Sequence, residues 1–141
     1  MAAPRPESEK RPIIVVADDD VDILNVIKLK LEANGYRAIT ARDGQEAIAA
    51  VQKRHPAFVI LDVMMPRLNG FQVARMIKFD KRLKTTPVLL LTVRQQETDR
   101  NLGRRVGADE YLAKPFDPQQ LLDRIASWLK RKAELTPQGD A

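Results

Sequence analysis

The stretch IIVVADDDVDIL, residues 13–24, joins five apolar residues to four acids within the next five positions. The apolar run from Ile13 to Ala17 is short and β-branched, as is typical of a strand buried on both faces. The acids that follow it are Asp18, Asp19, Asp20 and Asp22. Two carboxylates about 4 Å apart repel by roughly 4 kcal/mol at an effective dielectric constant of about 20, so such a cluster needs solvent or a bound cation. The stretch predicts a core strand that ends in a cation site.

The same pattern, a short apolar strand followed by an amphipathic helix, repeats along the chain. We expect five strands, at residues 13–17, 37–41, 58–61, 88–91 and 110–113. We expect helices that run from Ile23 to Asn34, around Ala47 to Val51, from Phe71 to Phe79, over about 97–106, and from Asp117 to about Lys132. Strict alternation predicts an α/β fold with a single doubly wound parallel sheet and helices on both faces.

The composition indicates one domain without a membrane anchor. The chain has 141 residues and no cysteine, which excludes disulfides, thiol chemistry and Cys-based zinc sites. No apolar run approaches the roughly 20 residues that span a bilayer, and the polar N-terminus lacks the apolar segment of a secretory signal. We therefore expect a cytoplasmic domain over residues 12–132, between disordered tails at 1–11 and 133–141.

The net charge of +5, from 24 Lys and Arg against 19 Asp and Glu, raises the question of nucleic-acid binding. The basic residues are scattered along the chain, and few aromatic residues are present to stack on bases. A solvated basic surface that docks an acidic partner is the better interpretation, and we do not expect this chain to bind nucleic acid.

Polar residues end four of the five predicted strands. In a parallel sheet of this kind, ligands bind beyond the carboxyl ends of the strands. The residues at these ends are Asp18 and Asp19, Asp62, Thr92 and Lys114. Oxygen ligands without histidine or cysteine suit a hard cation, Mg²⁺ before Ca²⁺. We expect the three carboxylates to hold Mg²⁺, and the metal to neutralise a phosphoryl group bound opposite.

Four motifs carry a resemblance to a known family. They are VVADDDVDIL (15–24), LDVMMPRLNG (61–70), LLLT (89–92) and GADEYLAKPF (107–116). Together they resemble the receiver domain of two-component response regulators, over about residues 13–132. The resemblance implies a flavodoxin-like (βα)5 fold with the strand order 2-1-3-4-5. It also implies a phosphorelay function in a bacterial cytoplasm.

The resemblance also assigns roles in phosphoryl transfer. Asp62 lies at the phosphoacceptor position, and a carboxylate beside a metal can attack phosphorus to form an acyl phosphate. Asp19 would ligate Mg²⁺ directly, Asp18 through water, and Met64 through its backbone carbonyl, with Asp62 completing the set. Asp20, a third acid, is better interpreted as the N-cap of the first helix.

The remaining site residues match the switch of the family. Thr92 matches the hydroxyl that donates to a phosphoryl oxygen, and Tyr111 lies at the aromatic switch position. Lys114 matches the lysine that pairs with Asp62 and then with the phosphoryl group, and Pro115 would follow a cis peptide bond. The domain would catalyse its own phosphorylation and dephosphorylation, and would not be an enzyme acting on a separate substrate.

The implied partners are proteins. The phosphoryl donor is a histidine on a kinase or on a histidine phosphotransfer protein. The downstream effector binds the face built from the fourth helix, the fifth strand and the fifth helix. That face carries Arg100, Arg104 and Arg105, so we expect an acidic partner surface there. A monomer and a phosphorylation-dependent dimer both fit, as do a stand-alone receiver and a piece of a longer protein.

One position departs from the family pattern. Receivers mostly carry Ala or Gly after the switch hydroxyl, whereas this chain has Val93, which puts phosphoryl access in doubt. The alternative is a pseudo-receiver, a protein-binding module that is never phosphorylated. A phosphatase of the haloacid dehalogenase type also uses a strand-end Asp, Mg²⁺, Thr and Lys. That class carries a second Asp where this chain has Met64, together with a cap domain, so we do not favour it.

Overall fold

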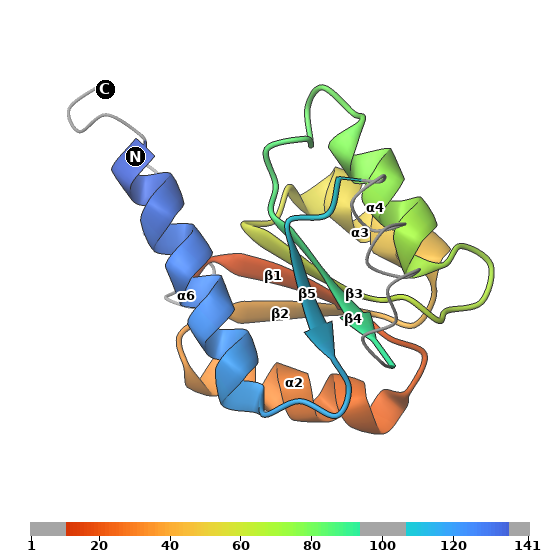
Figure 1. Ribbon diagram of the computed structural model, residues 1–141, viewed down its shortest axis with the longest axis horizontal. Coiled ribbons are helices and arrows are strands. Elements are labelled where there is room, and N and C mark those ends of the chain that lie inside the picture. Colours follow the sequence, from red (N-terminus) through yellow and green to blue (C-terminus); the bar gives the residue numbers. More distant parts are fainter. Residues whose placement is uncertain (1–10, 94–106, 136–141) are drawn as a thin grey trace, which may run out of the picture.

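The structure, a computed structural model, describes residues 11–93 and 107–135. Its strands form one parallel sheet in the order β2-β1-β3-β4-β5 (Figure 1). They are β1 (Ile13–Ala17), β2 (Arg37–Ala41), β3 (Phe58–Asp62), β4 (Val88–Thr92) and β5 (Glu110–Ala113). The predicted fold class and strand order are confirmed. Two strands are one residue longer than predicted, so that Asp62 and Thr92 belong to the sheet itself.

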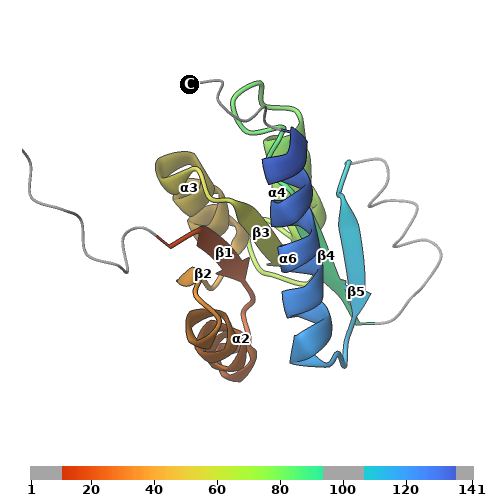
Figure 2. The ribbon, with the colours of Figure 1, turned by 90° about the vertical axis from the view of Figure 1, so that its left-hand side faces the viewer.

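Helices cover both faces of the sheet (Figures 1 and 2). They are α2 (Val21–Ala33), α3 (Gly44–Arg54), α4 (Gly70–Lys78) and α6 (Pro118–Leu135). α3 and α4 pack on one face, and α2 and α6 pack on the other. The helix predicted over 97–106 lies outside the described residues. Among the described residues, no helix is both long and apolar enough to cross a bilayer.

The strand side chains alternate between two hydrophobic clusters. Val15 and Ala17 of β1 belong to the cluster under α3 and α4. Ile14 and Val16 belong to the cluster under α2 and α6. Because this strand is covered on both faces, its side chains from Ile14 to Ala17 are all buried. A fully buried Val or Ile contributes about 1.5–3 kcal/mol. The continuous apolar runs of the sequence follow from this double burial.

Side-chain caps define where the helices begin. Asp20 accepts hydrogen bonds from the backbone N–H groups of Asp22 and Ile23, which confirms Asp20 as the N-cap of α2. Asn69 and Gln72 form a reciprocal capping box at the start of α4. These hydrogen bonds satisfy N–H groups that have no partner within the helix.

The predicted tails need correction at both of their inner ends. α6 does not end at Lys132 but continues to Leu135, so residues 133–135 are helical and not part of a disordered tail. Ala, Glu and Leu are good helix formers, and the first residue that opposes a helix is Pro137. Arg11, assigned to the N-terminal tail, donates a hydrogen bond to the carbonyl of Glu32.

Candidate functional site

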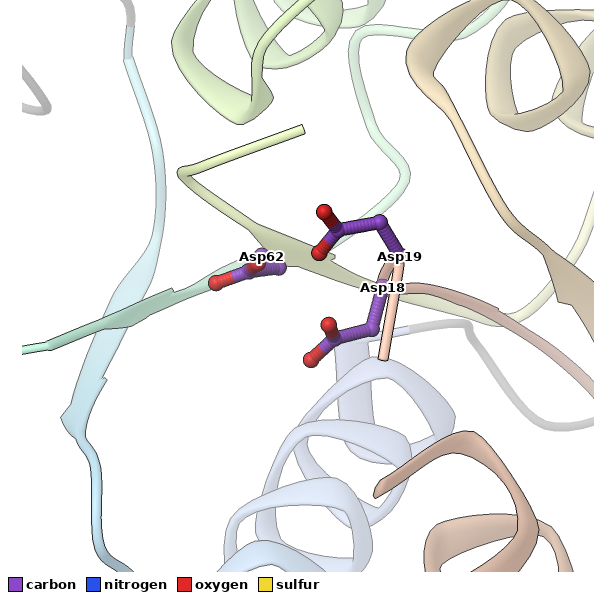
Figure 3. A group of neighbouring side chains, drawn as sticks. All are labelled: Asp18, Asp19 and Asp62. Atoms are coloured by element: carbon purple, nitrogen blue, oxygen red, sulfur yellow. The ribbon is translucent and has the colours of Figure 1, made fainter. Parts of the chain in front are cut away.

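Three carboxylates converge at the carboxyl ends of β1 and β3. Ala17, the last residue of β1, pairs with Leu61 of β3. The residues that follow them, Asp18 and Asp62, therefore come at the same level of the sheet. Carboxylate oxygens of Asp18, Asp19 and Asp62 all lie within 4.8 Å of one another (Figure 3). Asp18 and Asp62 are buried, and Asp19 is exposed. The predicted acidic cluster is therefore present in the fold.

Backbone hydrogen bonds hold Asp18 and the residue after Asp62 in place. The N–H of Asp18 donates to the carbonyl of Ala41 over 3.1 Å, and Asp18 Oδ1 accepts from the N–H of Asp20 over 2.9 Å. On the other side of the cluster, the N–H of Val63 donates to the carbonyl of Leu91 over 3.0 Å. The two buried carboxylates are therefore carried by a rigid part of the fold.

Lys114 brings a positive charge to both buried carboxylates. Its ammonium donates a hydrogen bond to Asp18 Oδ2 at 2.8 Å and lies 3.2 Å from Asp62 Oδ1. The Lys114–Pro115 peptide bond is cis, as the resemblance implied. The nearer partner of Lys114 is Asp18 and not Asp62, although the strand of Asp18 lies farther from β5 in the sheet. The spacing of motifs along the sequence did not indicate this order.

The single positive charge of Lys114 does not neutralise the three carboxylates of this cluster. Burial, helped by the charge of Asp18 and opposed by Lys114, raises the pKa of Asp62 to about 6. Burial by itself would lower the pKa of Lys114, but the hydrogen bond to Asp18 and the charges of both acids outweigh it and raise that pKa. Asp62 Oδ1 is buried, and among the described residues its only partner is the Lys114 ammonium in the 3.2 Å ion pair. The site thus has three carboxylates, one ammonium and an excess of negative charge.

This donor set fits a hard divalent cation. The ligands on offer are carboxylate oxygens, which Mg²⁺ and Ca²⁺ prefer over nitrogen or sulfur. Asp19 is open to solvent, so hydrating water can reach the cluster. Met64 is 65% exposed, and because its soft thioether does not suit a hard cation, its backbone carbonyl is the group it would offer.

Thr92 and Tyr111 occupy neighbouring strands beside the cluster. Thr92 ends β4, which lies between β3 and β5, and its side chain is buried. Tyr111 is half-buried on β5 and packs against the hydrophobic cluster under α3 and α4. Val93, directly after Thr92, is 58% exposed at the rim of the site.

Close backbone packing shapes the loop after Asp62, and sequence patterns alone did not show it. A Cβ atom at Gly70, the first residue of α4, would lie 2.4 Å from the carbonyl oxygen of Asp62. The N–H of Gly70 donates to the carbonyl of Val63 over 3.0 Å. α4 therefore begins in contact with the backbone of the central carboxylate. The glycine itself is the only sequence signal of this contact.

An apolar cavity of about 820 Å³ adjoins the cluster on the side of α2. Its lining residues are Asp22, Ile23, Val26, Ile27, Val93, Lys114, Pro115, Phe116 and Pro118. Val26 is half-exposed and lies outside the buried stripe of α2. We did not predict this cavity, because its walls come from three segments that are distant in the sequence.

Comparison of the chain with known protein families and proteins agrees with this geometry. Residues 14–126 match the family model for the response regulator receiver domain. The chain is 36% identical over 127 residues to the alkaline phosphatase synthesis transcriptional regulatory protein PhoP of Bacillus subtilis, covering 90% of this chain and 52% of that protein. The chain thus spans about half the length of this relative.

Solved receiver domains share the fold. The receiver domain of the Francisella response regulator 1452 matches with a TM-score of 0.79 and 34% identity, covering 86% of this chain and 98% of that one. The receiver domain of the Pseudomonas aeruginosa sensor histidine kinase PA1611 matches with a TM-score of 0.79 and 26% identity, covering 85% of this chain and 98% of that one. That domain holds a magnesium ion in its active-site cleft. Fold, strand-end residues and sequence similarity agree: this chain belongs to the response regulator receiver domain family.

Proposed function

We propose that Asp62 accepts a phosphoryl group from a phosphohistidine on a partner kinase or histidine phosphotransfer protein. The observation that carries the proposal is the convergence of three carboxylates within 4.8 Å beside the Lys114 ammonium. Such a site favours a cation and then an anion bound to that cation. The PA1611 receiver domain, with magnesium in its cleft, supports the same chemistry for this chain.

Asp18, Asp19, Asp62 and the carbonyl of Met64 would hold Mg²⁺, which when bound neutralises charge on the phosphoryl oxygens. One carboxylate oxygen of Asp62 attacks phosphorus, and the bond from phosphorus to the donor nitrogen breaks with its electron pair left on the imidazole. Lys114 stays within reach of Asp62 and offsets the charge that the phosphoryl group adds. Attack of water on phosphorus reverses the modification, so the domain catalyses both its loading and its own dephosphorylation.

The apolar cavity beside the cluster supports a protein donor. It lies between α2 and the segment after β5, and Lys114 lines both the cavity and the acidic site. An apolar helix face of a partner would bury Ile23, Val26 and Phe116 there and bring a histidine to the rim. The donor segment therefore docks on α2 and the segment after β5, and not on α3 or α4.

Phosphorylation would shift the domain between two packings. Thr92 would move toward the phosphoryl group and Tyr111 would turn inward, which reshapes the face that includes β5 and α6. The three arginines expected on that face, in the segment 97–106, lie outside the described residues. An acidic effector surface is the proposed partner. Effector-binding mutations that mapped to α3 and α4 would contradict this assignment.

Trp128 offers an internal reporter of that shift. It is the only tryptophan of the chain, its indole N–H donates to Glu110 of β5 over 3.1 Å, and Arg131 stacks on its ring at 4.4 Å. Arg124 of α6 also pairs with Glu110. A change in the packing of β5 against α6 would therefore change the fluorescence of Trp128.

The deciding experiment is intact-mass spectrometry after incubation with acetyl phosphate and Mg²⁺. We expect one added phosphoryl group on the wild type, none on Asp62→Asn, and none when a chelator removes the metal. Asp123→Asn, which changes an exposed carboxylate on α6, is the matched control and should label like the wild type. A wild type that takes up no phosphoryl group would favour the pseudo-receiver. Equal labelling of Asp62→Asn would place the acceptor elsewhere.

The family also suggests a cellular location, an oligomeric state and a class of output for the protein. We propose a cytoplasmic role, as a monomer or as a dimer that forms on phosphorylation. PhoP of Bacillus subtilis is a transcriptional regulator by name and about twice as long as the matched region. A transcriptional output is therefore the class of response that we propose for the whole protein that contains this receiver.

A further inference from the structure

The loop that follows Asp62, residues 63–69, is fixed at its two ends. At its start, the carbonyl of Val63 accepts a hydrogen bond from Gly70 over 3.0 Å. At its end, the capping box of Asn69 and Gln72 joins it to α4. Met64, whose carbonyl is a proposed metal ligand, lies between these points. The position of that carbonyl therefore depends on what holds the middle of the loop.

The start of α3 touches the middle of this loop. A Cβ atom at Gly44 would lie 2.0 Å from the carbonyl oxygen of Leu68 and 2.4 Å from its Cβ. Real Cβ atoms do not approach so closely, so even alanine at this position would push the two backbones apart. Gly44 is needed here for space. The contact joins the β2–α3 connection to the loop that carries Met64.

A second contact joins the same two segments. Arg67 adopts a positive φ of 70°, which is uncommon for a residue with a side chain. Its Nε lies 3.4 Å from Asp43 Oδ2. Asp43 Oδ1 accepts a hydrogen bond from Glu46 over 2.8 Å and so caps α3. One carboxylate thus caps a helix and holds the strained residue of the neighbouring loop.

We propose that Asp43, Gly44 and Arg67 are positioning residues for the metal site, and this rests on the proposed function. None of them belongs to the acidic cluster. They act through the loop, because they set how closely α3 and the backbone of residues 67–68 approach. Asp43 and Arg67 are 15% and 65% exposed, and an ion pair so open to solvent changes an equilibrium constant by up to about fivefold. The close contact at Gly44 is the stronger constraint.

Charge removal on the two sides of the ion pair gives a sharp test. Asn caps a helix as well as Asp does, so Asp43→Asn keeps α3 capped and removes only the charge. If these residues acted through their electric field alone, Asp43→Asn would weaken Mg²⁺ binding and Arg67→Gln would strengthen it. If they position the loop, both substitutions weaken it. The sign of the Arg67→Gln effect separates the two explanations.

The measurement is the Kd for Mg²⁺ by isothermal titration calorimetry of the full chain. We expect Asp43→Asn and Arg67→Gln each to raise the Kd by up to about fivefold, and the double variant to do no more than either alone, because both remove one contact. Arg67→Lys, which keeps the charge, should restore part of the affinity. Gly44→Ala should raise the Kd by about tenfold or more, since backbone has to move.

Controls separate this inference from folding and from the proposed function. Arg82→Gln breaks another exposed ion pair, to Asp80, and should leave the Kd unchanged. Thermal unfolding without metal identifies any variant that is merely unfolded; the two charge variants decide if Gly44→Ala does not fold. A wild type without Mg²⁺ binding overturns both the function and this inference. A wild type that binds Mg²⁺ and is labelled at Asp62, with a Kd that Arg67→Gln leaves unchanged or lowers, overturns the positioning inference alone.

Discussion

Lys114 and Asp62 face each other at 3.2 Å although their strands are not neighbours, because β4 separates β5 from β3. The ammonium reaches across the end of β4, and it also donates to Asp18. A single cation thus links the first, third and fifth strands of the chain at the edge where they end. These ion pairs therefore affect both the stability of the fold and the affinity of the three carboxylates for a cation.

Removal of this ammonium should lower stability and raise metal affinity. Lys114→Met leaves two buried carboxylates without their cation, so the free energy of unfolding in a chelator should fall by about 3 kcal/mol. The Kd for Mg²⁺ should fall, because the metal no longer shares the carboxylates with an ammonium. Urea unfolding and calorimetry measure the two effects. Lys28→Met, which changes an exposed lysine on α2, is the control. An equally large loss of stability in Lys28→Met would show that the effect does not come from the buried carboxylates.

The pKa of Asp62 predicts a pH dependence of stability. Because the folded-state pKa, about 6, lies above the ordinary value of 3.8, the folded chain binds more protons than the unfolded chain between these values. Without metal, the free energy of unfolding should therefore decrease as the pH rises from about 4 to about 6, by up to about 3 kcal/mol. Asp62→Asn should remove this decrease, and Mg²⁺ should offset it. Chelated wild type whose stability rises over this range would contradict the prediction.

The lifetime of the phosphorylated state should depend on Val93. Hydrolysis needs a water in line with the bond to phosphorus, and Val93 and Met64 are exposed at the rim of the site. Neither side chain can orient or activate a water, so dephosphorylation should be slow. The next residue along the chain, Arg94, lies outside the described residues. Val93→Ala should shorten the phosphoryl half-life, measured by loss of label. Val26→Ala is the control, and an unchanged half-life in Val93→Ala would show that Val93 does not limit access.

Gly70 should matter for both stability and phosphorylation. Gly70→Ala places a methyl group against the Asp62 carbonyl, and we expect a loss of about 2 kcal/mol of stability and slower labelling of Asp62. Gly35→Ala is the matched control. Gly35 has a φ of 90° and open space around it, so alanine there should cost about 1 kcal/mol through backbone strain alone. Its labelling rate should equal that of the wild type. Slower labelling in both variants would point to general destabilisation.

Sequence patterns predicted the strands and the convergence at their ends for a physical reason. A doubly covered strand has to be apolar throughout, and its first polar residue then marks the edge of the sheet. Asp18 and Asp62 were found in this way. Contacts between connecting segments leave no such pattern, because they depend on how two loops meet in space. The pairing of Arg67 with Asp43 is one example, and the nearer pairing of Lys114 with Asp18 is another.

The alternation of side chains across the sheet has a consequence for signalling. By this alternation Asp62 follows Ile60 on the side of α2 and α6, whereas Thr92 follows Leu90 on the side of α3 and α4. Tyr111 pairs with Leu90 and shares its side. The proposed phosphoryl group would therefore be received on one side of the sheet, while Thr92 and Tyr111, which would respond to it, lie on the other. To reach the proposed effector face, this response would have to cross the sheet. β5 is the element that can carry it, because its Tyr111 lies on one side of the sheet while its Glu110 contacts Trp128 and Arg124 of α6 on the other.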